Sequence, residues 1–512
     1  MSNITAIKNK FVYKCNLGIT LHLSQRMYKA RIKNKWIIYA PDTAGLPILI
    51  SNDTYQLLQC FINGQKIGHV ISTLGRLDIK VDKLIEMISF LEEKGFLKTE
   101  KTPARYSAYD THNSDPTSFG IWLHINNQCN LECSYCFVNK FDKTMDKPVT
   151  DETIFNIVHT IRSRSIKKVI LKFAGGEPTL SMPLVERFHT QLLIALADVD
   201  VELHTSILSN GTIITDQLIS FLKKPNCEIG ISLDGYGSDY HDIYRKYKGT
   251  KKGSWNKIIE NISILADHGI KPYIMSTISE ATCESLPDLV NWIFKNKLRT
   301  RLSIVRQPSE KVFEREKNTC LIQNKETKKD NQLHEIPSPD VKYENLLNVM
   351  IDAFEKAFTE LENNTHSINL VNSLSICELH FNKPSYTACC GIGSTHVVIQ
   401  EDGYLASCPM TLKESNIPVK NNDLLATIKH SYSINAHTRN DLKNPCLECQ
   451  WFPVCVGGCP VNNERQLGSP LNISPLHRFY QYVIPRYITF YGTKLYQASI
   501  KLKINHMHII EG

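Results

Sequence analysis

The sequence predicts an α/β protein whose main domain is a partial, TIM-like (β/α)6 barrel. The 512-residue chain has a composition typical of globular proteins, with 42% hydrophobic and 21% charged residues. Between residues 121 and 305, strand-like and helical segments alternate. Such alternation is typical of parallel strands joined by covering helices. Six strands are too few to close an eight-stranded barrel, so we expect a partial barrel with its chemistry at the carboxyl ends of the strands.

Each element of the barrel is predicted by its own pattern. The strand-like runs are short and rich in aliphatic residues, and they lie at 121–125, 168–173, 202–209, 228–233, 272–278 and 301–305. Helical patterns fall between them, near 152–163, 183–197, 215–223, 254–268 and 285–296. Ser254 and Ser285 begin two of these helices and are expected N-caps.

The rest of the chain divides into smaller units. A strand and three short helical patterns, near 53–62, 67–74 and 81–93, give the N-terminal unit a winged-helix-like outline. An amphipathic pattern at 341–362 predicts a helix that bridges two domains. The predicted division is a winged-helix-like domain at 1–110, a linker at 111–119, the barrel at 120–307, a polar insertion and bridging helix at 308–384, a cysteine-rich domain at 385–480 and a C-terminal tail at 481–512.

Charge and hydropathy narrow the class of protein. The N-terminus is polar and basic without a secretory apolar core, and no apolar run is long enough to span a membrane, so we expect a cytoplasmic protein with no membrane partner. The formal charge is +8, but basic residues are not interleaved with aromatic ones, so we expect no nucleic acid partner. A basic surface that meets an acidic peptide is the better interpretation.

The chain has 16 cysteines, and most fall in two groups, at 129–136 and 389–459. In a reducing cytosol, grouped cysteines indicate metal or cluster ligation rather than disulfides. The isolated cysteines are expected to be small buried hydrophobic residues, and they are Cys15, Cys60, Cys227, Cys283 and Cys320.

The first group has the spacing C-x3-C-x2-C, formed by Cys129, Cys133 and Cys136 directly after the first predicted strand. Such a loop can place three thiolates on three irons of one [4Fe–4S] cluster and leave the fourth iron open to a small molecule. A zinc site usually takes four protein ligands and fits this motif less well.

With Phe137 following it, this motif resembles that of the radical S-adenosylmethionine (SAM) superfamily. The resemblance implies a catalytic cluster on Cys129, Cys133 and Cys136 with SAM at its open iron. It further implies reductive cleavage of SAM to methionine and a 5′-deoxyadenosyl radical, which abstracts a hydrogen from the substrate. An electron donor such as flavodoxin or ferredoxin is then an expected partner.

Later strands end in residues that match the family's SAM pocket in order. In AGGEP, backbone or carboxylate acceptors suit the SAM amino group, and Ser209 and Asn210 resemble the polar contact to its ribose or carboxylate. The SAM-binding residues implied by the resemblance are Phe137, Gly175, Gly176, Glu177, Pro178, Ser209, Asn210, Ser232, Asp234 and Arg245. The sequence leaves open whether Arg245 meets the SAM carboxylate or is an ordinary surface charge, and whether Thr277 faces the pocket.

The second group has the pattern C-x12-G-x4-C followed by C-x2-C-x5-C-x3-C. A zinc ribbon is one interpretation. Behind this barrel, however, the array resembles the SPASM extension, which holds two auxiliary [4Fe–4S] clusters. The resemblance assigns Cys390, Cys408 and Cys459 to the first auxiliary cluster and Cys446, Cys449 and Cys455 to the second.

The sequence does not decide which residue is the fourth ligand of each auxiliary cluster. The family usually has one more cysteine downstream, but none follows Cys459, and His477 stands near the expected place. Imidazole can ligate a cluster iron, and a plain surface histidine is the alternative. For the first auxiliary cluster, Cys389, Cys377 or the substrate itself could complete the site.

The substrate class follows from the N-terminal unit, which resembles the element that grips leader peptides of ribosomally made natural products by strand addition. A generic structural cap is the alternative. The leading hypothesis is a maturase that crosslinks or similarly modifies a ribosomal precursor peptide, with the leader bound by the N-terminal domain. The competing hypotheses are a sulfatase-type maturase that forms formylglycine, an enzyme acting on a tetrapyrrole, and a zinc-dependent regulator.

Overall fold

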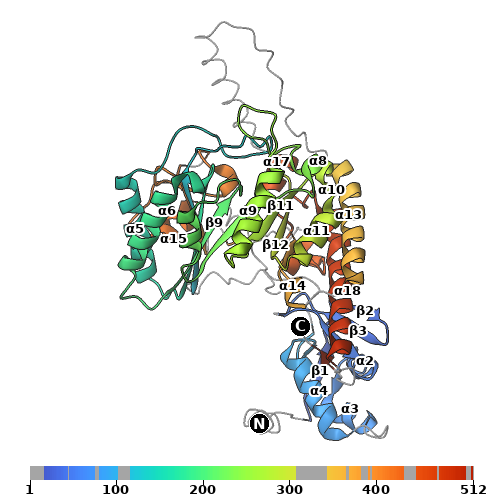
Figure 1. Cartoon of the computed structure of the whole chain (residues 1–512). Helices are drawn as coiled ribbons and strands as arrows, with labels where there is room; N and C mark the ends of the chain where they lie inside the picture. Colours follow the sequence, from blue (N-terminus) through green and yellow to red (C-terminus); the bar gives the residue numbers. More distant parts are fainter. Residues whose placement is uncertain are drawn as a thin grey trace.

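Figure 1 shows a computed structural model of the chain. The structure describes residues 17–502 and 509–510, apart from 44, 75–79, 102–115, 307–342, 365–367, 377, 382–389, 392–394, 415, 432–444 and 470–471. The predicted polar insertion, most of the predicted linker, Cys15 and Cys320 lie outside the described residues.

A nine-stranded sheet forms the centre of the molecule, in the order β13-β12-β11-β10-β9-β8-β7-β14-β15. All six predicted barrel strands are present and parallel: β7 (Ser118–Asn126), β8 (Lys168–Gly175), β9 (Glu202–Ser209), β10 (Cys227–Ser232), β11 (Tyr273–Ile278) and β12 (Thr300–Ile304). The predicted α/β class with a parallel sheet is confirmed.

Three short strands that the sequence analysis missed extend this sheet. They are β13 (Leu374–Ile376), parallel to β12; β14 (His396–Ile399), parallel to β7; and β15 (Leu405–Ala406), antiparallel to β14. Since β14 and β15 belong to the cysteine-rich region, that region is hydrogen-bonded directly to the strand that precedes the first cysteine motif.

Side chains along each strand point alternately to the side of the sheet that the helices cover and to the inner side of the sheet. In β7, Phe119, Ile121, Leu123 and Ile125 are each at most 1% exposed and join the main hydrophobic core. The covering helices lie where the sequence predicts them, and they are α5 (Lys147–Arg162), α6 (Met182–Ala195), α7 (Asp216–Leu222), α9 (Trp255–Asp267) and α11 (Leu286–Lys295). Short helical turns η3 (Pro178–Ser181), α8 (Ser238–His241) and α10 (Glu280–Cys283) follow strand ends.

Ser254 and Ser285 occupy the predicted N-cap positions, but their hydroxyls do not cap the helices. Ser254 Oγ donates to the carbonyl of Arg245, and Ser285 Oγ donates to the carbonyl of Thr282. At α9 the cap comes from Asp242, whose Oδ1 accepts from the backbone N–H groups of Ser254 and Trp255. The predicted N-cap positions are therefore confirmed, whereas capping by the serine hydroxyls is wrong; at α9 the acceptor comes from Asp242, 12 residues before Ser254.

The N-terminal domain consists of three helices and the strands of two small sheets. Its strands are β1 (Thr20–Leu23), β2 (Tyr28–Ile32), β3 (Lys35–Tyr39), β4 (Ile48–Ser51), β5 (Gln65–Lys66) and β6 (Leu97–Lys98), and its helices are α2 (Asn52–Gln59), α3 (Ile67–Leu74) and α4 (Val81–Glu93). The three helices lie at the predicted places; the winged-helix assignment stays a prediction.

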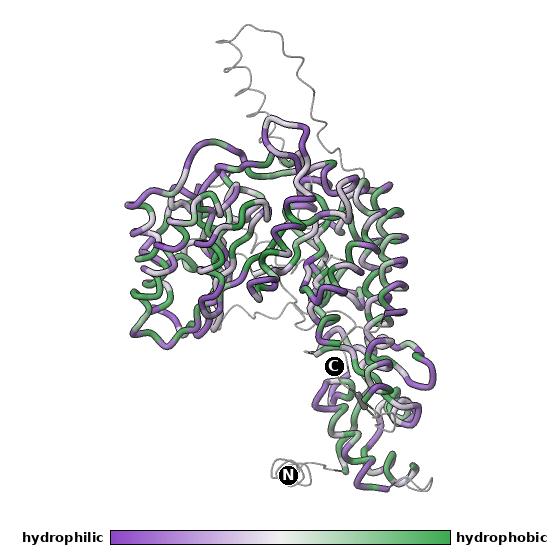
Figure 2. The backbone as a smooth tube through the Cα atoms, in the orientation of Figure 1, coloured by the Kyte–Doolittle hydropathy of each residue, from purple (hydrophilic) through white to green (hydrophobic). Residues whose placement is uncertain are grey.

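Two long helices connect this domain to the barrel. The predicted bridging helix is α13 (Tyr343–Asn363), and Met350, Phe354, Phe358 and Leu361 on its predicted apolar face are at most 2% exposed. Figure 2 shows its turns alternating between hydrophilic and hydrophobic colour. Beside it runs α18 (His477–Lys501), which crosses the boundary predicted at residue 480 (Figure 1).

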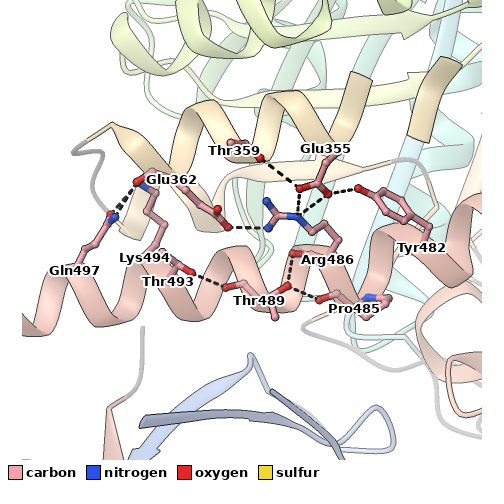
Figure 3. Close-up of polar contacts among 10 residues, drawn as sticks. All are labelled: Glu355, Thr359, Glu362, Tyr482, Pro485, Arg486, Thr489, Thr493, Lys494 and Gln497. Atoms are coloured by element: carbon pink, nitrogen blue, oxygen red, sulfur yellow. Dashed lines mark hydrogen bonds and ion pairs between the residues drawn. The ribbon is translucent and has the colours of Figure 1, made fainter. Parts of the chain in front are cut away.

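The contact between α13 and α18 is aromatic, as between Phe354 and Phe479, and it is also polar, as Figure 3 shows. Arg486 Nε donates to both carboxylate oxygens of Glu355, at 2.8 and 3.0 Å, and its Nη1 donates to Glu362 at 2.7 Å. Lys494, only 2% exposed, donates to the carbonyls of Glu362 and Asn364. Through these bonds, Arg486 and Lys494 hold α18 against α13 at two places along the helix.

The chain's last described residues return to its beginning. β16 (Ile509–Ile510) pairs antiparallel with β4 and gives a four-stranded sheet of order β16-β4-β3-β2. The remaining elements are α14 (Ile368–Asn372), η4 (Pro409–Thr411), α15 (Leu424–Ser431), η6 (Pro445–Glu448), α16 (Phe452–Cys455) and α17 (Pro460–Leu467). No helix in the described part of the chain is long and apolar enough to cross a membrane.

Candidate active site

The first cysteine motif leaves the carboxyl end of β7 and brings its three thiols into one neighbourhood. Burial alone would lower the pKa of Lys140, but the thiols of Cys136, Cys133 and Cys129 raise it above its usual value. Burial raises the pKa of Cys129 to about 11, and nearby Lys140 opposes that shift. Three thiols around one cation fit a cluster site, because iron binds cysteine as the thiolate.

Gly175 and Gly176 allow β8 to end against the chain that leads into the cysteine loop. The N–H of Gly176 donates to the carbonyl of Asn126 at 2.8 Å, and the N–H of Glu177 donates to the carbonyl of Gln128 at 2.7 Å. A side chain on Gly175 would collide with Asn126, and one on Gly176 would collide with the Gln128 carbonyl. Glycine is needed at both positions because two backbones touch there.

Glu177 is fully buried, and its carboxylate is already occupied within the protein. Oε1 accepts from the Thr179 N–H (3.0 Å), the Thr179 hydroxyl (2.6 Å) and the Ser209 hydroxyl (2.8 Å). Oε2 accepts from the Asn210 N–H at 2.7 Å. Burial raises the pKa of Glu177, and these hydrogen bonds oppose the shift. Glu177 therefore joins the ends of β8 and β9, and its carboxylate is engaged by the protein itself.

Asn210 connects the end of β9 to the cysteine loop. Its Nδ2 donates to Asn130 Oδ1 at 2.8 Å and lies 3.9 Å from the sulfur of Cys129. Its Oδ1 accepts from the N–H and the hydroxyl of Thr212. The side chain thus places an N–H donor beside a predicted cluster ligand, where hydrogen bonds to sulfur tune the cluster.

On the other side of the loop, Asp234, Tyr135 and Arg245 form a buried polar group. Tyr135 Oη donates to Asp234 Oδ2, Arg245 Nη1 donates to Tyr135 Oη at 2.5 Å, and Asp234 Oδ1 accepts from the Thr277 N–H at 2.9 Å. Thr277 thus enters this network through its backbone. Ser232, two residues before Asp234, is half-buried at the end of β10.

Arg245 is 7% exposed, which excludes the surface-charge interpretation that the sequence left open. Burial would lower the pKa of its guanidinium, but Cys133, Tyr135 and Asp234 raise it well above its usual value. Its Nε is buried and has no hydrogen-bond partner among the described residues. Arg245 therefore offers a donor to an incoming anion beside Cys133.

The sequence analysis missed Tyr135, although it lies inside the C-x3-C-x2-C motif between the second and third cysteines. An aromatic residue with a hydroxyl in an otherwise short polar loop was the available signal. Its role depends on Asp234 and Arg245, far along the chain, and only the fold brings these together.

The structure also brings together the cysteines predicted for the first auxiliary cluster. Burial raises the pKa of Cys408 to about 12, and the nearby thiols of Cys459 and Cys390 raise it further while Arg306 opposes them. Phe137 packs into the small hydrophobic cluster that contains Cys408 and Cys459. Phe137 thus lies between the two cysteine groups.

The other predicted auxiliary ligands follow one another through tight turns. The N–H of Cys449 donates to the carbonyl of Cys446 at 3.1 Å, and Cys455 ends α16. His477 is exposed at the first turn of α18. One turn later, Gln481 Nε2 donates to the sulfur of Cys449 at 3.4 Å, a contact the sequence analysis missed. Cys389 and Cys377 lie outside the described residues.

None of the described cysteines forms a disulfide. Of the isolated ones, Cys283 is buried as predicted, whereas Cys60 and Cys227 are only partly buried. In the described part of the chain, no group of three or more His, Cys, Asp or Glu is close enough to hold a single metal ion.

Residues 123–293, which contain the cysteine loop and the strands that surround it, match the model of the Radical SAM superfamily. The chain is a radical SAM enzyme. This family uses a [4Fe–4S] cluster and SAM, the two cofactors predicted from the sequence. The match places the superfamily's domain on the parallel sheet described above.

Curated relatives extend the similarity beyond that domain. A cysteine-type anaerobic sulfatase-maturating enzyme of Clostridium novyi is 27% identical over 67% of this chain and 88% of its own length. A serine-type anaerobic sulfatase-maturating enzyme of Bacteroides thetaiotaomicron is 24% identical over 70% of this chain and 87% of its own. Each of these relatives therefore leaves about a third of this radical SAM enzyme unmatched.

Among solved structures, a histidine-tagged anSMEcpe with bound AdoMet aligns with 77% of this chain and 100% of that chain. The TM-score is 0.54 at 17% sequence identity, so the likeness shows the shared α/β fold.

Proposed function

We propose that the chain is a peptide maturase in which Cys129, Cys133 and Cys136 hold the catalytic [4Fe–4S] cluster. The observation that carries this proposal is that one edge of the sheet gathers three thiols, the glycine turn after β8 and the unpaired Nε of Arg245. When bound, the cluster and SAM would supply a 5′-deoxyadenosyl radical for hydrogen abstraction.

The chain's own residues bind and orient SAM in this proposal. Arg245 donates to the SAM carboxylate through its free Nε, since a guanidinium suits carboxylate recognition. The backbone carbonyls of Gly175 and Gly176 accept from the SAM ammonium. Glu177, Ser209, Asn210 and Asp234 act as positioning residues, because their polar atoms are bonded to other parts of the site.

Two auxiliary clusters complete the proposal. The shared surroundings of Cys390, Cys408 and Cys459 support their assignment to one cluster, and the consecutive turns at Cys446, Cys449 and Cys455 support the other. His477 stands one helical turn from Gln481, which already contacts Cys449, so its ring is a candidate fourth ligand. We propose SPASM-like chemistry here on these contacts and on the spacing.

For the substrate, we propose a ribosomal precursor peptide that the enzyme crosslinks. The N-terminal domain supports this choice, because its two small sheets have edges to which an extended peptide can add. A second candidate is formylglycine formation, favoured by the two sulfatase-maturating relatives that match most of their own lengths.

Anaerobic co-expression with short open reading frames that neighbour the gene, followed by mass spectrometry, separates the two. A peptide that loses two hydrogens per modification and does not react with a hydrazide supports a crosslink. A hydrazide-reactive aldehyde supports formylglycine. SAM cleavage without any modified peptide or protein would contradict both.

A further inference from the structure

The N-terminal sheet of β16, β4, β3 and β2 is covered on both faces. Ile37, Tyr39 and Leu49 point into the main core, on the side where α18 packs. Their neighbours Ile38, Ile48 and Ile50 belong to the second core, with residues of α2 and α4. An extended peptide can therefore join this sheet only at an edge.

Of the three strands that the N-terminal domain contributes to this sheet, β2 and β4 are the outer two, and they differ in chemistry. β2 carries Lys29 and Arg31, both exposed, and charged side chains on an edge strand discourage pairing with another chain. β4 instead has the run Ile48-Leu49-Ile50, each at most 4% exposed. Of the two, β4 is the strand suited to accept a further strand.

That edge is taken by the chain's own residues 509–510. In the antiparallel pairing, Ile509 stands opposite Ile50 and Ile510 opposite Leu49. Within the described residues the pairing spans two residues of each strand, and a strand of that length forms few backbone hydrogen bonds. The preceding helix, α18, is fixed to α13 through Arg486, Glu355 and Glu362 (Figure 3), and its end is therefore a defined starting point for the tail.

We propose that the β4 edge is the docking edge for the substrate peptide and that β16 occupies it as an internal competitor. The inference rests on the proposed peptide substrate. The peptide binds antiparallel to β4, with two adjacent aliphatic residues in the places of Ile509 and Ile510. It must first displace the tail, which acts at the high effective concentration of a tethered strand, on the order of millimolar.

The test uses the holoenzyme and a variant that ends at Leu502. The probe is a fluorescein-labelled synthetic peptide with the sequence of residues 503–512, whose binding is measured by fluorescence anisotropy. We expect the truncated enzyme to bind the probe at least about tenfold more tightly than the full chain, since a tethered competitor is gone. A probe with proline in place of both isoleucines should not bind, because proline cannot donate to the strand pairing.

A full-length variant keeps the test independent of truncation. Ile509→Pro/Ile510→Pro should gain probe affinity as the truncation does, whereas the matched control Ile504→Pro, which keeps both isoleucines of β16, should behave as the unaltered chain. Equal probe affinity in the full and truncated enzymes, or no binding to either while both still cleave SAM, would overturn the inference.

Peptide modification distinguishes this failure from failure of the proposed function. For a peptide that the enzyme modifies, removal of the tail should lower KM about tenfold and leave kcat unchanged. If the enzyme modifies a peptide and its KM is the same with and without the tail, competition by the tail is refuted and the proposed function is still supported. Probe binding by the truncated enzyme with no peptide modified supports the docking edge and refutes the function.

Discussion

The two cysteine regions carry the same type of side chain, but the secondary structure that holds them differs greatly. Cys129, Cys133 and Cys136 follow a nine-residue buried strand. The loop is fixed by Asn210, just after β9, and by Arg245, in the segment between α8 and α9. The second region is built from turns and helices of three to eight residues. Its connection to the sheet is the pair of strands β14 and β15.

This difference indicates a division of labour. The sheet gives the first region a rigid frame, as catalysis on a bound cofactor requires. The second region consists of turns and short helices and contacts the first through Phe137. If this comparison is right, damage to the first region should abolish the chemistry, and damage to the second should change what the chemistry achieves.

The largest effect is expected for Cys133→Ala. SAM cleavage should fall more than about a thousandfold, because the cofactor that performs the chemistry is lost. Iron and sulfide analysis should show the loss of one cluster with the others retained. The matched control is Cys283→Ala, a buried cysteine away from both groups, which should keep its full iron content.

Cys408→Ala tests the second region. We expect peptide modification to fall about a hundredfold or more while SAM cleavage stays within about threefold, because the first cluster keeps all its ligands. Liquid chromatography of 5′-deoxyadenosine and mass spectrometry of the peptide measure the two outcomes. Equal loss of both activities would show that the regions do not divide the work.

Arg245→Met should raise the KM for SAM roughly 10- to 100-fold, because a buried charge-assisted hydrogen bond to the carboxylate is lost. Arg245→Lys should recover part of the affinity, since it keeps the charge without the planar donor pair. Arg162→Met removes an exposed ion pair with Asp198 and is the control, expected to leave KM unchanged. An unaltered KM for SAM in Arg245→Met would contradict the proposed contact between Arg245 and the SAM carboxylate.

Glu177→Gln tests the frame of the first region. The amide presents an N–H₂ group to donors that now face a carboxylate, so we expect the free energy of unfolding to fall by about 2–3 kcal/mol. Chemical denaturation of the anaerobic enzyme measures it. Glu186→Gln, at a surface pair with Lys224, should cost less than about 1 kcal/mol.

The smallest effect concerns His189, which fixes α6 to β9 through Thr205 Oγ1 at 3.1 Å. Burial and, next, Lys224 lower its pKa to about 4 from an ordinary 6.5. The unfolded chain therefore takes up a proton before the folded one, and stability is lost as the pH falls from 6.5 toward 4. His189→Asn should show a smaller drop in Tm between pH 7 and pH 5 than the unaltered chain, whereas His159→Asn, at an exposed site, should not.

The sequence predicted the parallel strands and the first cysteine motif because each is local: the strands have their own apolar pattern, and the motif is one continuous loop. It missed β14 and β16 because two- to four-residue strands have no detectable period and are stabilised by partners far along the chain. It likewise missed Gln481 beside Cys449, since glutamine on a helix carries no signal for such a contact.

Glu177 shows a different limit. Its motif was visible, but the carboxylate could serve a ligand or the protein, and only the positions of Thr179, Ser209 and Asn210 show that the protein uses it. For Arg245 the sequence left two interpretations, and its burial in the fold excludes the ordinary surface charge. The sequence thus predicts which residue types gather, and the fold shows which of their atoms are left for a ligand.

The pairing of Ile509 with Ile50 also has a consequence for synthesis. A ribosome makes the N-terminal domain first, so the apolar β4 edge stays uncovered until residues 509–510 emerge. β14 similarly reaches β7 only after the whole barrel has been translated. Because such distant pairings form late and slowly, we expect the nascent enzyme to depend on chaperones that shield exposed strands until translation ends.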